Sequence, residues 1–363
     1  MRVLAVTGSS GGHIFPALSF LDTLKDRHKG IDALLVMPRS AARFHVLAGK
    51  CRVEYISISP LGSGFNFKNL NAVLNLLKGS LESLFIMFEF RPDVVVGFGT
   101  IDCVPLLLLA WIFRVKTLIH EQNVSFGRAN KLLAHFADKT AISFEETRQY
   151  LKCRKKNIVL TGNPIRKELK VMDKREALSF FGLKESRLTV LVMGGSQASH
   201  RINQGFLEAV SALPDISKLQ IIHICGIKDY KFVRDKYRAL DADSRVFDFL
   251  DAMQYAYNAC DLIVSRAGAT SITEMMYFGL PAILIPYPYA YEHQLNNARV
   301  LESKGRAFII KDEDLDKGAL TQRMGAFINN PGELKGMRSN YAPLPENSAG
   351  DLLVKEVMSL SEA

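Results

Sequence analysis

Short apolar runs alternate with helix-like segments along the whole chain, and this alternation restricts the fold more than any other feature. The runs are nearly continuous stretches of valine, isoleucine and leucine, which is typical of parallel strands buried on both faces. Repeated strand-then-helix order predicts an α/β protein with parallel, doubly wound sheets. The expected strands are residues 3–7, 33–37, 53–58, 94–97, 117–120, 140–143 and 158–160, followed by 188–193, 220–225, 246–249, 262–265, 282–285 and 307–310.

A break in this pattern divides the chain into two halves. Residues 161–174, TGNPIRKELKVMDK, combine an Asn-Pro turn with many charges. A chain of 363 residues is long enough for two domains. We therefore expect two Rossmann-like domains that face each other across a cleft, at residues 1–163 and 164–345. A closing helix in residues 346–363 is expected to return to the first domain, although its residues alone would let it pack on either.

The net charge limits the classes of binding partner, and the cysteine content indicates the cellular compartment. The formal net charge of +9 favours an acidic partner, such as nucleic acid, an anionic membrane surface or a phosphorylated substrate. Nucleic acid is not expected, because neither a basic helix nor an aromatic platform accompanies the charge. Five cysteines without zinc-like spacing suggest free thiols in a reducing cytosol. The longest apolar stretch, residues 104–119, is interrupted by Arg114 and falls short of the ~20 residues that cross a bilayer.

Three glycine turns follow expected strands and precede helical segments. They lie at residues 9–13 (SSGGH), 97–100 (GFGT) and 194–196 (GGS). Glycine lets a backbone approach a ligand closely, and the first N–H groups of a helix attract anions. None of the turns is a Walker loop or a clean GxGxxG. They predict an anion site in each half, with a tight turn that binds nothing as the alternative.

The densest group of polar side chains lies in residues 249–297. Glu274 stands in the first turns of an expected helix after Gly268. Such a carboxylate either stabilises the helix start, by about 0.3–1 kcal/mol, or accepts hydrogen bonds from the two hydroxyls of a ribose. His293, Gln294 and Asn297 follow at the next loop-to-helix junction, where they suit the hydroxyls of a sugar or belong to a surface helix.

Together these motifs resemble the MurG family of GT-B glycosyltransferases. The resemblance covers essentially the whole chain, with GGHIFPA at 11–17, HEQN at 120–123, GNPIR at 162–166, GGSQ at 194–197, RAGATSITE at 266–274 and HQLNNA at 293–298. It implies transfer of N-acetylglucosamine (GlcNAc) from UDP-GlcNAc to undecaprenyl-diphospho-N-acetylmuramoyl-pentapeptide, which forms lipid II for peptidoglycan. It also implies a peripheral protein at the cytoplasmic face of the membrane. Because one fold supports many chemistries, the assignment depends on these motifs and not on the architecture.

The resemblance implies a donor site in the second half. The implied set is Arg166, Ser196, Leu250, Met253, Ala269, Thr270, Ser271, Glu274, His293 and Gln294. Arg166 and Ser196 would hold the diphosphate of UDP, and residues 269–271 would line its path. The Leu250 backbone would read the uracil edge beside Met253. Glu274 would hold the ribose, while His293 and Gln294 would contact GlcNAc.

An acceptor site in the first half is implied in the same way. His13 and Asn123 would lie near the reacting hydroxyl, and the pocket for the lipid diphosphate would be shaped by Gly11, Gly12, Gly97 and Gly99. An α-linked donor and a β-linked product imply in-line attack by the C4 hydroxyl, which needs one base. His13 is the expected base because imidazole titrates near neutral pH; its alternative role is a hydrogen bond to the acceptor diphosphate. No paired-aspartate motif stands in the expected region, so we expect neither a metal nor a cofactor.

Two segments bear on the acceptor side. Residues 65–91 are rich in leucine and phenylalanine with Lys68, Lys78 and Arg91 nearby, and the resemblance implies that this region meets the bilayer; ordinary core faces are the alternative. Residues 97–105 depart from the family's glycine-aromatic-small-glycine-proline order, and Asp102 places a carboxylate near the expected acceptor diphosphate. Residues 198–199 are Ala-Ser where the family usually has Gly-Ala. The donor half therefore matches the family better than the acceptor half.

Other functions are compatible with the same architecture. One is another lipid glycosyltransferase, such as a diacylglycerol galactosyltransferase, or a UDP-GlcNAc 2-epimerase. The other is a catalytically silent sugar-nucleotide-binding protein. The HEQN segment and the pair His293-Gln294 favour the GlcNAc transferase, and intact His13 and Glu274 argue against a silent protein.

Overall fold

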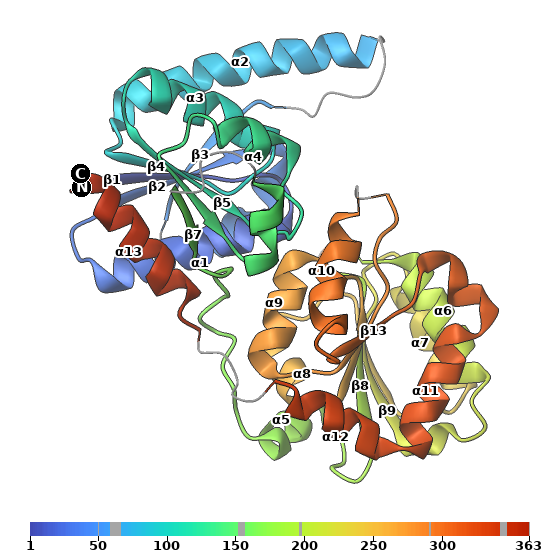
Figure 1. The fold of residues 1–363 in the computed structure, drawn as a ribbon. Coiled ribbons are helices and arrows are strands. Elements are labelled where there is room, and N and C mark those ends of the chain that lie inside the picture. The colour runs from blue at the N-terminus through green and yellow to red at the C-terminus, as the bar shows by residue number, and fades with distance from the viewer. Residues whose placement is uncertain are drawn as a thin grey trace. The chain divides into compact units, whose positions relative to one another are not determined.

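The computed structural model describes residues 1–49, 51–58, 67–151, 157–195, 198–289, 292–341 and 347–362. The chain divides into two compact units, Met1–Arg166 with Asn347–Ala363, and Lys167–Glu346. Each unit holds one parallel sheet with helices on both faces (Figure 1). The α/β class with two Rossmann-like sheets, which the alternating pattern predicts, is confirmed. Along the sequence, the boundaries between the units fall after Arg166 and after Glu346, whereas the expected boundaries fell after residues 163 and 345.

The first unit is built on a seven-stranded sheet in the order β3-β2-β1-β4-β5-β6-β7. Its strands are β1 (Arg2–Val6), β2 (Asp32–Pro38), β3 (Arg52–Ile56), β4 (Val94–Gly97), β5 (Lys116–Glu121), β6 (Lys139–Ile142) and β7 (Ile158–Leu160). Its helices are α1 (Gly11–Arg27), α2 (Phe67–Phe90), α3 (Val104–Ile112), α4 (Arg128–Leu133) and α13 (Ala349–Ser361), with short 3₁₀ segments η1 (Arg39–Ala48), η2 (Ile101–Cys103) and η3 (Glu145–Tyr150).

Strand β1 shows why the sheet is covered on both sides. Val3 and Ala5 belong to a core cluster shared with α1 and α13, whereas Leu4 and Val6 belong to a second cluster shared with α2 and α3. Successive side chains of a strand point to opposite faces, so a strand that is apolar at every position requires helices on both.

The closing helix α13 packs along α1 within the first unit. Arg27 at the end of α1 pairs with Asp351, with 2.7 Å between Nε and Oδ1. Gly350 lies against the Thr23 side chain, where a Cβ atom would come within 2.6 Å of Oγ1. The two helices are more than 320 positions apart in sequence, and the close contact at Gly350 allows their backbones to approach.

The second unit is built on a six-stranded parallel sheet in the order β10-β9-β8-β11-β12-β13. Its strands are β8 (Leu188–Met193), β9 (Leu219–Ile224), β10 (Ser244–Phe247), β11 (Leu262–Ser265), β12 (Ala282–Leu284) and β13 (Ala307–Ile309). Its helices are α5 (Lys174–Phe181), α6 (His200–Ser211), α7 (Tyr230–Ala239), α8 (Met253–Ala259), α9 (Ala269–Phe278), α10 (His293–Glu302), α11 (Ala319–Asn329) and α12 (Pro331–Ser339), with η5 (Ile216–Lys218) and η6 (Asp312–Lys317). Most expected strands recur within a residue or two. The expected strand at 246–249 begins earlier, at Ser244, because it pairs with Ile221 of β9.

Two further expectations concern cysteines and membrane crossing. Cys51, Cys103, Cys225 and Cys260 are free thiols, and Cys153 lies outside the described residues. Among the residues that the structure describes, none of the helices has both the length and the apolar character needed to cross a membrane.

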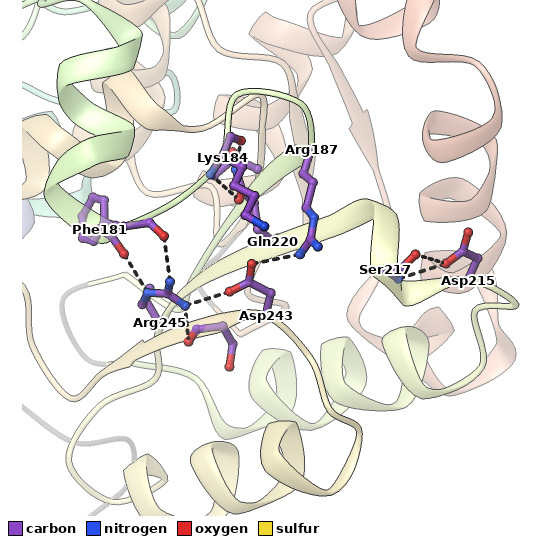
Figure 2. Close-up of polar contacts among 11 residues, drawn as sticks. Phe181, Lys184, Arg187, Asp215, Ser217, Gln220, Asp243 and Arg245 are labelled. Carbon is purple, nitrogen blue, oxygen red and sulfur yellow. Dashed lines mark hydrogen bonds and ion pairs between the residues drawn. The ribbon is translucent and has the colours of Figure 1, made fainter.

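Arg245 joins three segments of the second unit (Figure 2). Its Nε donates to the Phe181 carbonyl at 2.7 Å, and Nη2 donates to the Gly182 carbonyl at 2.9 Å. Its third nitrogen, Nη1, lies 2.8 Å from Asp243 Oδ1, and Asp243 also receives Arg187 at 3.0 Å. A cation that donates to the last carbonyls of a helix satisfies groups that the helix itself leaves unpaired. Arg245 therefore attaches the end of α5 to strand β10.

We expect Arg245→Met to lower the free energy of unfolding by about 1–2 kcal/mol. The Phe181 and Gly182 carbonyls and the Asp243 carboxylate would each lose the guanidinium, which is partly exposed, as a hydrogen-bond donor. Urea unfolding followed by circular dichroism measures the change. Arg175→Met is the control, since its ion pair with Glu185 is exposed and should contribute under about 0.5 kcal/mol. Equal effects of the two substitutions would contradict this account of Arg245.

Candidate active site

The glycine turn after β1 leads directly into α1. Ser10 is the N-cap, and its carbonyl accepts from the backbone N–H groups of His13 and Ile14, both at 3.0 Å. Gly11 is buried, Gly12 and His13 are half-buried, and the first turn holds no acidic residue. A helix start without its own carboxylate suits a bound anion. The expected geometry of strand, turn and helix at residues 9–13 is thus present.

His13 is held by a buried polar group from the HEQN segment. Its Nδ1 lies 2.9 Å from Gln122 Oε1. The Gln122 Nε2 donates to the Phe98 carbonyl at 3.3 Å and lies 3.0 Å from His120 Nδ1. The His120 Nε2 lies 2.9 Å from the Gly162 carbonyl. Burial lowers the pKa of His120 to about 4, so this ring is neutral near neutral pH.

The glycine turn after β4, at residues 97–100, approaches the same histidine. Gly99 has φ +81°, and a Cβ atom there would lie 3.3 Å from His13 Nδ1. Thr100 also has positive φ, and its hydroxyl donates to Asp102 at 2.8 Å. Burial raises the pKa of Asp102, and the Thr100 hydrogen bond and the charge of His13 lower it in part. Gly97 instead lies against Leu107 of α3, so helix packing accounts for a glycine there; its role in acceptor binding stays a prediction.

Glu121 organises the loop that carries Asn123. One carboxylate oxygen accepts from the Asn123 backbone N–H at 3.0 Å and from its side-chain amide at 3.2 Å. The other accepts from Gly127 N–H and from the Asn130 amide, both at 2.9 Å. Glu121 is buried, and these four donors satisfy its two oxygens within the loop. Its role is therefore to shape the loop.

Arg166 belongs to the first unit, at its end. Its guanidinium stacks 4.7 Å from the centre of the Phe15 ring of α1. This contact places the cation against the N-terminal part of α1, on a residue two positions after His13. A role in holding the diphosphate stays a prediction.

In the second unit, three loops follow neighbouring strands. Their described residues are 194–195 and 198–199 after β8, 266–268 after β11, and 285–289 and 292 after β12, and these strands are adjacent in the order β8-β11-β12. Carboxyl ends of parallel strands share one edge of a sheet, so these loops lie together there. Ser196 and Gln197 lie outside the described residues, as do Ala290 and Tyr291.

The glycine turn after β8, which begins at Gly194, differs from the expectation in one respect. Helix α6 does not follow Gly195 and Ser196 directly but begins at His200, with Ser199 as its N-cap. The Ser199 side chain accepts from the Ile202 N–H at 3.4 Å and from Arg266 Nη2 at 3.0 Å. Gly194 must lack a side chain, because a Cβ atom would collide with the backbone at Ser199. Gly194 therefore lies directly against Ser199, the N-cap of α6.

Arg266 is a site residue that the sequence analysis did not single out. It is buried, it pairs with Asp312, and it donates to the Ile285 carbonyl at 3.1 Å. With Ser199, these contacts tie the loops after β8, β11 and β12 to one guanidinium. The motif RAGATSITE contains it, but its partners come from segments far along the chain.

Helix α9 begins at Ala269, directly after Gly268, which is its N-cap. Ala269, Thr270 and Ser271 form its first turn, which has no acidic residue. Glu274 is buried at 5% exposure, and its Oε2 accepts from the Tyr257 hydroxyl at 2.6 Å. Met253 opens α8, the helix of Tyr257, and Leu250 lies just before it; both are buried.

Helix α10 places Gln294 between two of the loops. Its Oε1 accepts from the backbone N–H groups of Ala267 at 3.2 Å and Tyr287 at 2.9 Å. These bonds orient the amide, so that any contact of Nε2 with a sugar would be as a donor. Asn297 is fully buried and donates to the Ala267 carbonyl at 3.1 Å. It supports the loop, and the expectation that its amide lies with His293 for a sugar is wrong.

The described residues contain no group of three or more His, Cys, Asp or Glu side chains that could hold a metal ion. The expectation of metal-independent chemistry stays a prediction.

Comparison with known proteins decides the family. Residues 3–142 match the glycosyltransferase family 28 N-terminal domain, and residues 189–352 match the C-terminal domain of that family. A UDP-N-acetylglucosamine–N-acetylmuramyl-(pentapeptide) pyrophosphoryl-undecaprenol N-acetylglucosamine transferase of Thermodesulfovibrio yellowstonii is 35% identical over 99% of both chains. One from Listeria monocytogenes is 33% identical over 99% of both. The chain belongs to the MurG family.

Solved structures agree with the MurG fold. The crystal structure of Acinetobacter baumannii MurG matches with a TM-score of 0.78, at 24% identity over 99% of both chains. A UDP-GlcNAc 2-epimerase from Neisseria meningitidis matches with a TM-score of 0.72, at 14% identity over 99% of this chain and all of that one. At these identities the likeness concerns the fold alone, which the transferase and the epimerase share. The transferases named above are similar to this chain over nearly its full length, at 33–35% identity, and this similarity favours the MurG family over the epimerases.

Proposed function

We propose that this chain transfers GlcNAc from UDP-GlcNAc to undecaprenyl-diphospho-N-acetylmuramoyl-pentapeptide and so forms lipid II. The observation that carries the proposal is its 35% identity, over 99% of both chains, to a relative named for that transfer. The two glycosyltransferase domains and the polar residues at the sheet edge of the second unit support it.

The donor is assigned to the edge of the second sheet where β8, β11 and β12 end. The first turn of α9, residues 269–271, offers N–H groups to the UDP diphosphate, and Ser196 and Arg166 supply further donors. Glu274 accepts from the ribose hydroxyls through its carboxylate, and Leu250 and Met253 border the uracil. His293 and Gln294 contact GlcNAc, with the Gln294 amide as a donor because its oxygen is held by Ala267 and Tyr287.

The acceptor is assigned to the turns around His13 in the first unit. Gly11, Gly12, Gly97 and Gly99 shape the pocket for the lipid diphosphate, and Asn123 lies on the loop held by Glu121. The C4 hydroxyl oxygen attacks the anomeric carbon as its proton passes to the imidazole of His13. The bond from that carbon to the UDP oxygen breaks, and the electron pair leaves with UDP, which gives inversion. Donors already in place stabilise the charge on UDP.

A radiolabel assay tests the proposed function. The full chain is incubated with UDP-GlcNAc labelled in the sugar and a short-chain analogue of the undecaprenyl acceptor, and products are separated. Labelled disaccharide on the lipid analogue, formed only when acceptor is present, is expected. Labelled N-acetylmannosamine would assign an epimerase, transfer to diacylglycerol would assign a different lipid transferase, and no turnover with any acceptor would assign a binding protein.

We also propose that the protein works as a peripheral protein at the cytoplasmic face of the membrane. Helices α2 and α3 lie side by side (Figure 1) and carry large apolar side chains on their outer surface. The exposed ones are Val73, Leu74, Leu77, Leu81, Phe85, Phe88, Trp111, Ile112 and Phe113, which we call the α2–α3 patch. Along α2, Leu74, Leu77, Leu81, Phe85 and Phe88 follow helical spacing, while the buried positions lie on the other side.

Exposed cations accompany the patch. Lys78, Arg91 and Arg114 lie on or beside α2 and α3. An apolar stripe bordered by cations binds an anionic membrane surface through burial and charge together. A contiguous patch of this kind is unusual on a surface that meets only water.

We expect the double substitution Leu77→Glu and Phe85→Glu to reduce binding to vesicles of phosphatidylglycerol and phosphatidylcholine at least tenfold. Full burial of a leucine or phenylalanine contributes about 1.5–3 kcal/mol, and an added carboxylate is repelled by the anionic surface. Co-sedimentation measures the binding. Ile227→Glu, at a residue 80% exposed in the second unit, is the control. Unchanged binding of the double variant would remove the patch from the membrane contact.

A further inference from the structure

A chain of hydrogen bonds connects His13 to the end of the first sheet. It runs from the Gly162 carbonyl through His120 and Gln122 to His13 Nδ1, with separations of 2.9, 3.0 and 2.9 Å. His120 is fully buried and Gln122 is 1% exposed, whereas His13 is half-buried. The half-buried ring is therefore the accessible end of an otherwise buried network.

The Gly162 carbonyl determines which atom donates and which accepts in every hydrogen bond of this network. A carbonyl only accepts, so His120 Nε2 must carry a proton toward Gly162. The pKa of His120, lowered to about 4 by burial, keeps that ring neutral, so its Nδ1 holds a lone pair. Gln122 must then present its NH₂ to His120.

The surroundings of Gln122 determine the same orientation independently. Its Nε2 faces the Phe98 carbonyl at 3.3 Å and the His120 carbonyl at 3.2 Å, both of which only accept. Turning the amide over would place its oxygen against these carbonyls and against the His120 lone pair. The amide oxygen must therefore face His13, and because this oxygen only accepts, His13 Nδ1 must donate.

We propose that Gln122, backed by His120, is a positioning residue that holds His13 in the tautomer with its proton on Nδ1, which leaves Nε2 as the atom that takes the proton of the acceptor hydroxyl. The inference rests on the proposed function, in which His13 is the base. Among the described residues none hydrogen-bonds Nε2. A fixed tautomer matters because a base works only through the nitrogen that faces its substrate.

The turn at Gly99 borders the contact between His13 and Gln122. A Cβ atom added at Gly99 would come within 3.3 Å of His13 Nδ1 and 3.4 Å of Gln122 Oε1, so a larger residue there would press on this contact. The titratable groups that act on His13 are Asp102, on the following turn, and His120. Asp102 is bonded by Thr100 and is not a hydrogen-bond partner of the His13 ring.

Nitrogen NMR tests the tautomer directly. The full chain is labelled with ¹⁵N-histidine, and the His13 signals are assigned from a His13→Ala spectrum. Two-bond correlations at a pH where the His13 ring is neutral should show a protonated Nδ1 and an unprotonated Nε2. Gln122→Met, which keeps the side-chain length without an acceptor oxygen, should lose this pattern. A wild-type ring protonated on Nε2 would overturn the proposal, whatever the activity.

Kinetics separate positioning from simple stabilisation. Gln122→Met should lower kcat for GlcNAc transfer at least tenfold and leave KM for UDP-GlcNAc within about twofold. In a His13→Ala background the same substitution should have no further effect on kcat, because Gln122 acts through that ring. A full additional loss in the double variant would assign Gln122 a merely structural role.

Gln220→Met is the matched control. Gln220 is an equally buried glutamine in the second unit, where its amide accepts from and donates to the Lys184 backbone (Figure 2). It also donates to the Thr189 hydroxyl. The substitution should lower stability without changing the His13 NMR pattern or kcat. If the Nδ1–H tautomer is present but His13→Ala remains fully active, the proposed function of His13 fails while the tautomer stands, so the two failures are distinguishable.

Discussion

His13→Ala is expected to lower kcat for GlcNAc transfer by a factor of about 10² to 10⁴, with little change in KM for UDP-GlcNAc. A base in this position removes the proton of the attacking hydroxyl in the transition state, and such transfer typically contributes a factor of that size. In the proposed complex the donor is bound mainly by residues of the second unit and by Arg166, so its affinity should not depend on the His13 ring. Initial rates over a range of UDP-GlcNAc at saturating acceptor analogue measure both parameters.

The control for this prediction lies on the same helix. His28 is the C-cap of α1, at the opposite end from His13, and His28→Ala should retain activity. If His13→Ala raised only KM for the acceptor and left kcat intact, the alternative role would hold, and the ring would bind the acceptor diphosphate without removing a proton.

Glu274→Ala is expected to raise KM for UDP-GlcNAc about tenfold to a hundredfold. Its carboxylate accepts from ribose hydroxyls in the proposed complex, and a hydrogen bond to a charged group contributes about 1.5–3 kcal/mol. The buried Tyr257 hydroxyl, 2.6 Å from Oε2, holds the carboxylate in place. Tyr257→Phe should therefore raise KM severalfold, less than Glu274→Ala. Isothermal titration with UDP measures the binding without the acceptor.

Glu208→Ala serves as the matched control for Glu274→Ala. Glu208 is exposed on α6, where it accepts from Gln204 on the same helix, and its loss should leave UDP binding unchanged. Unchanged UDP affinity in Glu274→Ala would remove the ribose role, and the carboxylate would then serve only the packing of α9 against α8.

Residues inside a motif were found from the sequence, whereas their partners were not. His13 stands out because it follows two glycines at the start of a helix, and Glu274 because it follows a glycine turn after a strand. Gln122 lies within HEQN, but nothing in that segment indicates a contact with a residue 109 positions earlier. Tyr257 has no signal at all, because an aromatic residue in a helix reads as core until the sheet brings α8 against α9.

The same distinction explains the corrections. Asn297 follows His293 at helical spacing and so reads as part of one polar cluster, yet it points into the protein and holds the Ala267 carbonyl. The start of α6 was expected too early, because the sequence does not reveal that Ser199, bound to Arg266, serves as its N-cap.

Local pattern was sufficient for the two parallel sheets, the glycine turns at the helix starts and the family motifs, because periodicity, turn chemistry and short motifs are properties of neighbouring residues. Only the folded chain decided which residue contacts Nδ1 of His13, which oxygen of Glu274 is held, and which polar side chains support a loop. Each of these depends on hydrogen-bond partners supplied by other strands and helices, and strand order, not sequence distance, determines which of them meet.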